Sequence, residues 1–321
     1  MKKALITGIN GQDGSYLCEY LLDLGYDVYG MVRRQSVSEN QSYRIKNVNH
    51  RIKTFYGDIT DKKSINNILN EVKPNEIYNL AAMSHVRISF EVPSFTIEVN
   101  SLGVLNLLDA YKDICPESKF YQASSSEMFG NSIDSDGYQR LSTQMNPVSP
   151  YGCAKVLGYN LVKHYRKAYN LHCCNGILFN HESPLRGTNF VTNKVVKGAV
   201  EIKKGFKNKL VLGNMDSSRD WGHSYDYVRA MHLILNHKNP RDWVVATGEN
   251  RTVRELCDYV FNSLNLNYQD YVVQDKKFMR PEELKYLKGD SGVIRKELGW
   301  NPMYTFESMI DEMVDNWMNK I

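Results

Sequence analysis

Short apolar runs alternate with longer amphipathic segments through the first half of the chain. The apolar runs predict strands over residues 3–7, 26–32, 53–57, 76–80, 119–124 and 173–178. The amphipathic segments predict helices over residues 14–24, 62–72, 95–112 and 149–169. Strands that alternate with helices favour right-handed crossovers and a parallel sheet covered on both faces. We therefore expect an α/β fold built on a doubly wound parallel sheet.

The second half of the chain is less regular. We expect a loop and helix over 188–204, a short strand over 243–247, and helices over 252–264 and 306–319. The sequence contains no internal repeat, no low-complexity tract and no Gly/Ser/Pro-rich linker between two halves. The C-terminal part is therefore expected to pack directly on the sheet.

The composition is that of an ordinary globular protein, with 42% hydrophobic and 24% charged residues among 321. A chain of this length can form one or two domains. Its formal net charge is +4, and the basic residues are dispersed along the sequence. A nucleic-acid binder would show a concentrated basic stripe, so we expect no nucleic-acid partner.

Six cysteines are present, with no CxxC pair and no spacing with histidine that suits a metal. We expect buried apolar cysteines in a reducing cytoplasm, and no bound metal. The apolar run near the N-terminus ends at Gly8, and no apolar stretch approaches the roughly 20 residues that a membrane helix needs. The sequence therefore predicts a cytoplasmic protein that does not bind membranes.

A glycine-rich turn follows the first predicted strand directly. Gly8, Gly11 and Gly14 form a GxxGxxG pattern that encloses Gln12 and Asp13. Glycines at a strand-to-helix junction allow a tight turn and a close approach of the backbone to a pyrophosphate, and the helix N-terminus supplies unpaired N–H groups. The position after a buried strand favours dinucleotide binding over a plain glycine turn.

The end of the second predicted strand indicates which dinucleotide binds. Enzymes that use NAD commonly carry an acidic residue there for the ribose 2′-hydroxyl, whereas this chain has Arg33 and Arg34. Because arginine can bind a phosphate through two hydrogen bonds, NADP is the expected cofactor. The alternatives are that these arginines lie on the surface or hold a partner subunit.

The segments after the third and fourth strands are further candidates for contact with the cofactor. Asp58 and Ile59 could face the adenine. The Leu80–Ala81–Ala82 segment is small, as a segment close to the cofactor should be. Simple packing is the alternative for both segments.

Tyr151 and Lys155 stand four residues apart at the start of a predicted helix. This spacing puts both side chains on one helix face. A nearby ammonium favours the phenolate, so Tyr151 is expected to act as a base near neutral pH. The pair follows the fifth strand of a dinucleotide-binding pattern, which favours catalysis over a solvated helix face.

A run of three serines, Ser124 to Ser126, and then Glu127 lie at the carboxyl end of the fifth predicted strand. Open α/β sheets bind ligands at this edge. A serine hydroxyl there can hydrogen-bond a substrate alcohol and share its proton with Tyr151. A plain reductase or 4-epimerase needs no further base, whereas a dehydratase needs a carboxylate to remove a proton beside a ketone. Glu127 therefore favours dehydration over a mere helix N-terminal charge.

Together these motifs resemble those of the GDP-mannose 4,6-dehydratase family of extended short-chain dehydrogenases. The matching segments are GxxGQDGSYL, VRR, NLAAxSHV, QASSSEMFG, PYGCAK, FNHESPLRG, LGNMDSSRDWGHSYDYV and RPEEL. The resemblance implies a Rossmann-like fold with a smaller, interleaved C-terminal substrate-binding domain. We expect residues 1–179 and 207–247 in the NADP-binding domain, and residues 180–206 and 248–321 in the nucleotide-sugar-binding domain.

The resemblance also implies roles for individual residues. Ser125 would hold the sugar 4-hydroxyl, Glu127 would be the acid and base, and Tyr151 would take the 4-hydroxyl proton with Lys155 as its electrostatic partner. The expected NADP contacts are Gly8, Gly11, Gln12, Asp13, Gly14, Arg33, Arg34, Asp58, Ile59, Leu80, Ala82, Ser84, Lys155, His181 and Arg186. The expected substrate contacts are Ser84, Ser126, Asn180, Val191, Lys194, Gly213, Arg219, Arg280 and Glu283.

Four positions depart from the family pattern. Ser125 stands where threonine is usual, and Met83 stands where glutamine is usual. Phe95 falls near a position that is often tyrosine, and Leu185 replaces one of two adjacent arginines. These changes bear on the identity of the sugar more than on the type of reaction.

The expected activity is conversion of GDP-mannose to GDP-4-keto-6-deoxymannose and water, by internal hydride transfer through tightly bound NADP. The alternatives are a dehydratase for another GDP-sugar such as a GDP-heptose, an epimerase or reductase of the same fold, and a catalytically silent NADP-binding regulator. The polar segment 35–47 is similar to a loop that reaches a neighbouring subunit in related enzymes. A homodimer or homotetramer is therefore expected.

Overall fold

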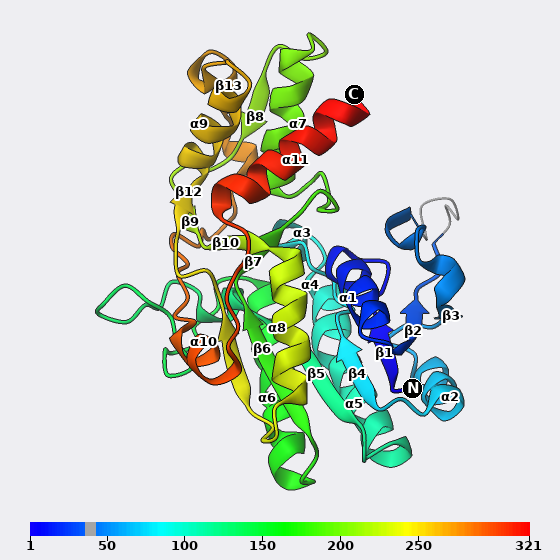
Figure 1. Cartoon of the computed structure of the whole chain (residues 1–321). Helices are drawn as coiled ribbons and strands as arrows, with labels where there is room; N and C mark the ends of the chain where they lie inside the picture. The colour runs from blue at the N-terminus through cyan, green and yellow to red at the C-terminus, as the bar shows by residue number, and fades with distance from the viewer. Residues whose placement is uncertain (36–42) are drawn as a thin grey trace.

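The computed structural model describes residues 1–35 and 43–321, which fold into a larger lobe around a sheet and a smaller lobe above it (Figure 1). The larger lobe contains both the first and the sixth strands of the chain. The C-terminal helix ends in the smaller lobe, on the side of the molecule where the N-terminal strands lie (Figure 1).

Among the described residues, the main sheet has seven parallel strands in the order β11-β6-β5-β4-β1-β2-β3. In chain order they are β1 (Lys3–Thr7), β2 (Asp27–Val32), β3 (Lys53–Tyr56), β4 (Glu76–Asn79), β5 (Lys119–Ser125), β6 (Cys173–Leu178) and β11 (Asp242–Val245). The chain reverses its direction of progress across the sheet between β1 and β4. This order confirms the predicted doubly wound, Rossmann-like fold, and the point of reversal is where such sheets bind ligands.

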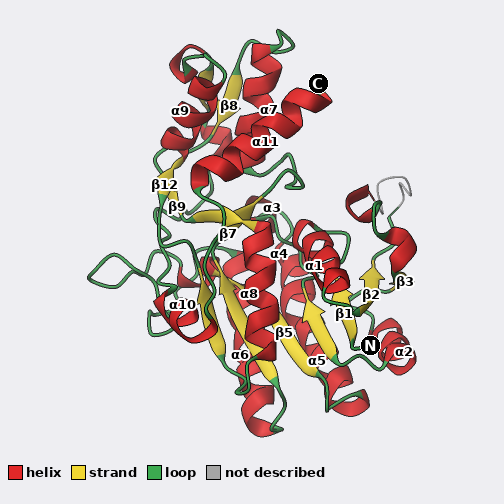
Figure 2. Cartoon of the chain, in the orientation of Figure 1, coloured by secondary structure: helices red, strands yellow, loops and turns green. Residues whose placement is uncertain are grey.

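Helices cover both faces of this sheet (Figure 2). One face packs against α1 (Gln12–Asp23) and α8 (Ser224–Asn236), and the other against α2 (Lys62–Val72), α5 (Gly103–Ile114) and α6 (Pro150–Ala168). Helix α8 was not predicted, although Val228, Met231 and Ile234 on it are fully buried. Its core face carries the polar Ser224 and Asp226 as well, which weakens the apolar periodicity.

The single helix predicted over 95–112 is three segments in the structure. These are α4 (Pro93–Ile97), a wider π-turn (Glu98–Leu102) and α5. Asn100 on the π-turn donates to the carbonyl oxygen of Met83 at 2.9 Å and accepts from its amide at 2.8 Å. The π-turn thus places the buried amide side chain of Asn100 against the loop that follows β4. This loop lies at the edge of the sheet where the strand order reverses.

The smaller lobe has its own apolar core. It is formed by α7 (Val191–Lys203), α9 (Val253–Ser263) and α11 (Phe306–Lys320), with the parallel pair β8 (Leu210–Leu212) and β13 (Val272–Gln274). Residues 207–219 lie with this core, whereas Ile294 of α10 (Gly292–Leu298) packs into the core beside α8. We therefore propose that the domain boundary be drawn with 207–219 in the smaller lobe and α10 in the larger.

Two short strand pairs lie between the lobes. Strand β7 (Asn180–Glu182) pairs with β10 (Trp221–His223), and β9 (Ser218–Arg219) pairs with β12 (Arg251–Thr252). The remaining short helices are α3 (Val86–Ser89), η2 (Tyr43–Ile45), η3 (Asn49–Arg51), η5 (Ser126–Phe129), η6 (Tyr268–Asp270) and η7 (Lys276–Phe278). Within 1–35 and 43–321, no helix is both long and apolar enough to cross a membrane.

Candidate active site

A cavity with two adjacent chambers lies at the carboxyl ends of the sheet strands. The larger chamber, between the lobes, measures about 620 Å³, and the smaller chamber, over the β1–α1 turn, about 470 Å³. Asp13, Ser84, His85, Arg186 and Phe190 line both chambers, so the two lie next to each other. The size of the two chambers together suits a long ligand that extends from one lobe into the other.

The smaller chamber is built on the glycine-rich turn. Gly8 has a φ of +70°, and a side chain there would meet the backbone nitrogen of Ala81 at 3.0 Å. A Cβ on Gly14 would lie 2.3 Å from the carbonyl oxygen of Gly8, so larger residues cannot replace it without moving backbone. Helix α1 begins at Gln12 with no side chain capping its first amides. This turn therefore fits the pyrophosphate of a dinucleotide.

Most of the predicted cofactor residues line this chamber, whereas Lys155 and His181 line the larger chamber and Arg34 lines neither. Those in its wall are Gly8, Gly11, Gln12, Asp13, Gly14, Arg33, Asp58, Ile59, Leu80, Ala82, Ser84 and Arg186. Arg33 reaches over the ring of Phe95, with 6.0 Å between its guanidinium carbon and the ring centroid. Arg34 is exposed and does not line either chamber. Of the segment 35–47, residues 36–42 lie outside the described residues.

Asp13 and His181, whose side chains are 23% and 12% exposed, form an ion pair beside the two chambers. The Nε2 atom of His181 lies 2.8 Å from Oδ2 of Asp13, and its Nδ1 atom lies 2.7 Å from the carbonyl oxygen of Phe179. A carboxylate and a carbonyl only accept, so both ring nitrogens must donate and His181 is a cation. Its ring also stacks on Tyr227 at 4.5 Å.

The remaining hydrogen bonds of this pair are also made. Ser224 donates to Oδ1 of Asp13 at 2.8 Å, and Gln12 donates to the carbonyl oxygen of His181 at 3.1 Å. Burial opposes both charges, but each partner stabilises the other. The pKa of Asp13 is lowered to about 2 and the pKa of His181 is raised. The pair thus fixes the β1–α1 turn to strand β7.

Ser125, Tyr151 and Lys155 come together in the larger chamber, from the end of β5 and the first turns of α6. Burial raises the pKa of Tyr151 to about 12. The hydrogen bond with the Ser125 hydroxyl acts in the opposite direction and lowers this pKa. The Nζ atom of Lys155 donates to the carbonyl oxygen of Ala123 at 2.9 Å and lies 5.6 Å from the centre of the Tyr151 ring. Burial thus outweighs the other influences on this pKa, and the stabilisation of the phenolate by the Lys155 ammonium stays a prediction. Burial also lowers the pKa of Lys155 to about 8.

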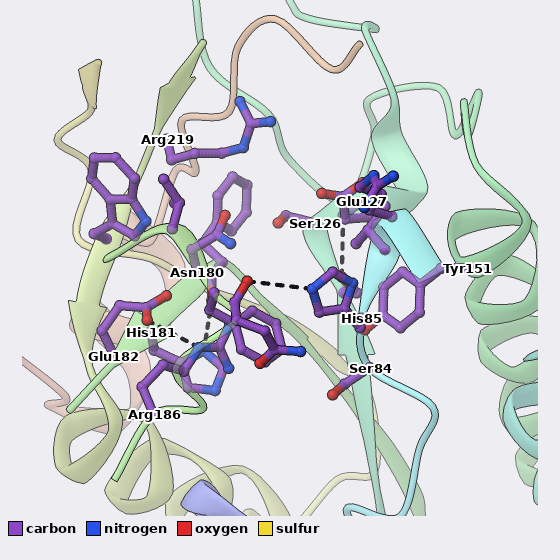
Figure 3. A pocket seen from close by; sticks show the side chains of 18 of the residues that line it. Ser84, His85, Ser126, Glu127, Tyr151, Asn180, His181, Glu182, Arg186 and Arg219 are labelled. Atoms are coloured by element: carbon purple, nitrogen blue, oxygen red, sulfur yellow. Dashed lines mark hydrogen bonds and ion pairs between the residues drawn. The ribbon is translucent and has the colours of Figure 1, made fainter. Parts of the chain in front are cut away.

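Glu127 projects into the same chamber from η5, immediately after Ser125, whose hydroxyl accepts the Glu127 amide at 3.2 Å. Figure 3 shows Ser126, Glu127 and Tyr151 on one wall, across from Asn180, His181 and Arg186. The Glu127 side chain is 6% exposed, and its Oε1 atom lies 3.4 Å from Nη1 of Arg280. Its Oε2 atom is buried and makes no hydrogen bond in the described structure. This carboxylate oxygen thus has no partner among the described residues, in a chamber that Tyr151 also lines.

The predicted substrate residues all line the larger chamber, with Ser84 and Ser126 on the larger lobe and the others on the smaller lobe or on the strands between the lobes. They are Ser84, Ser126, Asn180, Val191, Lys194, Gly213, Arg219, Arg280 and Glu283. Burial and the nearby Arg280 lower the pKa of Arg219 to about 10, which the carboxylates of Glu127 and Glu283 partly offset. A Cβ on Gly213 would lie 2.7 Å from the carbonyl oxygen of Phe278, so this wall requires glycine.

The comparisons with known proteins agree with this geometry. Residues 5–313 match the family model described as GDP-mannose 4,6 dehydratase. The relative named GDP-mannose 4,6 dehydratase 1, from Arabidopsis thaliana, is 47% identical over 324 residues, which cover 98% of this chain and 89% of that one. The chain belongs to the GDP-mannose 4,6-dehydratase family. The resemblance that the motifs carried is thereby confirmed.

Solved structures share the family fold. The dTDP-glucose 4,6-dehydratase DesIV from Streptomyces venezuelae, with NAD and TYD bound, superposes with a TM-score of 0.86 at 25% identity, covering 99% of this chain and 97% of that one. The structure of RMD from Pseudomonas aeruginosa, complexed with NADPH, gives 0.83 at 21% identity, covering 99% and 100%. The fold itself thus accommodates either dinucleotide.

The structure adds site residues that the sequence prediction missed. His85 lines both chambers, and its ring lies tilted against that of Phe190, with 5.2 Å between the ring centroids. Glu182 lies 2.9 Å from Nε of Arg186. Phe278 lies under Nζ of Lys194, 4.3 Å from its ring centroid. His85 and Glu182 fall inside the family segments NLAAxSHV and FNHESPLRG, so those segments held the signal. In the described ranges, no group of three or more His, Cys, Asp or Glu residues is placed to hold a metal ion.

Proposed function

We propose that this chain converts GDP-mannose to GDP-4-keto-6-deoxymannose and water. The observation that carries the proposal is the position of Glu127, a buried carboxylate with one unpaired oxygen beside Ser125 and Tyr151. An epimerase or reductase would use Ser125, Tyr151 and Lys155, and the unpaired Glu127 oxygen would have no role in its reaction. A dehydratase requires it.

The cofactor we propose is NADP, held in the smaller chamber. The glycine-rich turn and the uncapped start of α1 fit its pyrophosphate. Arg33 at the end of β2 supplies a cation for the 2′-phosphate, where an NAD enzyme would have a carboxylate. When bound, the nicotinamide ring would supply a site that takes up a hydride and gives it back.

The first half of the reaction depends on Tyr151. Its phenolate oxygen takes the proton of the sugar 4-hydroxyl, while carbon 4 loses a hydride and becomes a ketone. Ser125, which already interacts with Tyr151, holds the same hydroxyl. Because burial raises the pKa of Tyr151 to about 12, the phenolate needs a positive charge nearby. The ammonium of Lys155, on the same face of α6, can supply it.

The second half depends on Glu127. The ketone acidifies the proton on carbon 5, and the free Oε2 atom removes it. Glu127 passes this proton to the 6-hydroxyl as the C6–O bond breaks, so water leaves. The hydride then returns to carbon 6. Tyr151 gives carbon 5 the proton that it took from the 4-hydroxyl, after exchange with solvent, and so becomes a phenolate again. The sugar has lost one water, and no net oxidation or reduction has occurred.

The proposal is tested by incubating the purified protein with GDP-mannose and NADP, without an added reductant. Mass spectrometry should show a product lighter by one water and no net consumption of cofactor. The same assay with NAD tests the choice of cofactor, and GDP-heptoses test the sugar. A product of unchanged mass would instead point to an epimerase.

We also propose a cytoplasmic homodimer or homotetramer. Ile97, Leu102 and Leu157 are 43%, 50% and 45% exposed, and the helices that bear them are in contact. Five of the six cysteines are buried and none is paired, which fits a reducing compartment. Light scattering coupled to gel filtration measures the mass, and a monomer at micromolar concentration would refute the assembly.

A further inference from the structure

The contact between Glu127 and Arg280 joins the two walls of the larger chamber. Glu127 lies on η5 in the larger lobe, and Arg280 follows η7 in the smaller lobe, 153 residues later in the chain. The single hydrogen bond between them is 3.4 Å long, which is at the weak end of the range for a charged pair. The contact is thus close enough to attract both charges and loose enough to break.

Arg280 also belongs to the cationic part of the chamber. Arg219 lies close enough to Arg280 for the charge of Arg280 to lower the pKa of Arg219. Lys194 lines the same chamber. In the described structure the two arginines face two carboxylates, those of Glu127 and Glu283. Glu283 is engaged elsewhere, since its Oε1 atom accepts the backbone amide of Arg280 at 2.8 Å. Glu127 is therefore the carboxylate that the Arg280 side chain contacts.

A nucleoside diphosphate would compete for this guanidinium. Its phosphate oxygens carry more negative charge than one carboxylate, and arginine binds them through two hydrogen bonds. The diphosphate would have to lie between Arg219 and Arg280 to neutralise both. Glu127 would then lose its counter-ion, while the substrate sugar comes within reach of its carboxylate.

We propose that Arg280 is a positioning residue that exchanges partners, bound to Glu127 before substrate arrives and to the substrate diphosphate afterwards. The inference rests on the proposed function, because it gives the diphosphate part of the substrate a role in readying the base. Before binding, Arg280 compensates the buried charge of Glu127. After binding, Glu127 has no cation on it and is free to take and return a proton.

The test measures binding and not turnover, with GDP as the probe and NADP-saturated protein in the calorimeter. Glu127→Gln should bind GDP roughly tenfold more tightly than the wild type, because Arg280 no longer has to leave a carboxylate. Arg280→Met should bind GDP at least roughly tenfold more weakly. In the Arg280→Met background, Glu127→Gln should not raise the affinity for GDP, because the arginine side chain that this change would release is absent.

Two outcomes would overturn the exchange. The first is an unchanged affinity for GDP in Glu127→Gln. The second is a gain in affinity that persists at full size in the Arg280→Met background, which would mean simple repulsion between Glu127 and the diphosphate. Lys194→Met is the matched control, since it removes a cation of the same wall that does not contact Glu127. It should weaken GDP binding and leave the gain from Glu127→Gln intact.

The proposed dehydratase function is tested separately, by assaying the same protein preparation for loss of water from GDP-mannose. If the wild type binds GDP and the coupling is present but GDP-mannose loses no water, the dehydratase proposal fails and the partner exchange stands. If the wild type dehydrates GDP-mannose and the coupling is absent, the exchange fails alone. Wild type that does not bind GDP at all overturns the exchange, whatever the dehydration assay shows.

Discussion

Two carboxylate–cation pairs, one near each end of the cavity, differ in how many of their hydrogen bonds are made. At the cofactor end, Asp13 binds His181 at 2.8 Å and also accepts from Ser224. At the substrate end, Glu127 lies 3.4 Å from Arg280 and has a second oxygen with no partner in the described structure. Both pairs join segments that are more than 150 residues apart.

The difference separates structure from chemistry. A carboxylate whose two oxygens both accept hydrogen bonds from the protein holds its surroundings in place. A buried carboxylate with a free oxygen costs stability, and a protein keeps it where a ligand will use it. We therefore propose that the Asp13–His181 pair shapes the chamber proposed for the cofactor, and that Glu127 takes part in the elimination.

The largest effect should come from Glu127→Gln, measured as turnover of GDP-mannose. The amide keeps the size of the side chain but cannot accept the carbon 5 proton, so kcat should fall about a thousandfold. The free energy of unfolding should change by less than about 1 kcal/mol, because the side chain of Arg280 is 23% exposed and water can solvate it. Variant turnover within about threefold of the wild type would remove Glu127 from the mechanism.

Asp13→Asn should have the opposite profile. It leaves the cation of His181 buried without its partner, so the free energy of unfolding in urea should fall by about 3 kcal/mol. Glu127→Gln, measured in the same way, is the matched control. If the two variants were equally stable, the contrast between the two ends of the cavity would be lost.

The pH dependence of stability should show the Asp13–His181 pair as well. The pKa of His181 is raised above its ordinary value of 6.5, so its contribution is complete below that pH and is lost as the pH rises through the raised value. The lowered pKa of Asp13 means that its contribution is present above pH 3.8 and is lost as the pH falls toward about 2. His181→Gln should therefore lack an alkaline decline of up to about 1 kcal/mol per pH unit. Identical slopes in urea titrations of both proteins would contradict the assignment of His181 as a cation.

The smallest effect should come from Ser125→Thr, which restores the residue usual in the family. The hydroxyl that interacts with Tyr151 is kept, and the added methyl restricts its rotamer. We expect kcat to change by about threefold or less, whereas Ser125→Ala should lose about a hundredfold. Steady-state kinetics with GDP-mannose would show whether the hydroxyl alone matters, because a large loss in both variants would mean that it does not.

Sequence alone predicted much of the larger lobe, because its signals are local. The turn at Gly8 follows its strand at once, and Tyr151 and Lys155 are neighbours on one helix, so spacing was enough. Helix α8 was missed because polar residues share its buried face. The pairing of His181 with Asp13 and of Arg280 with Glu127 could not be predicted, since only the packing of the two lobes brings these side chains together.

The most direct test of the central claim is the reaction of GDP-mannose in heavy water, followed by mass spectrometry after transfer to ordinary water. The wild type should give a product that has lost one water and gained one carbon-bound deuterium, at the carbon 5 position that exchanges its proton. Glu127→Gln should return the substrate with neither change. Water loss by Glu127→Gln at the wild-type rate would contradict the assignment of the free carboxylate oxygen to elimination.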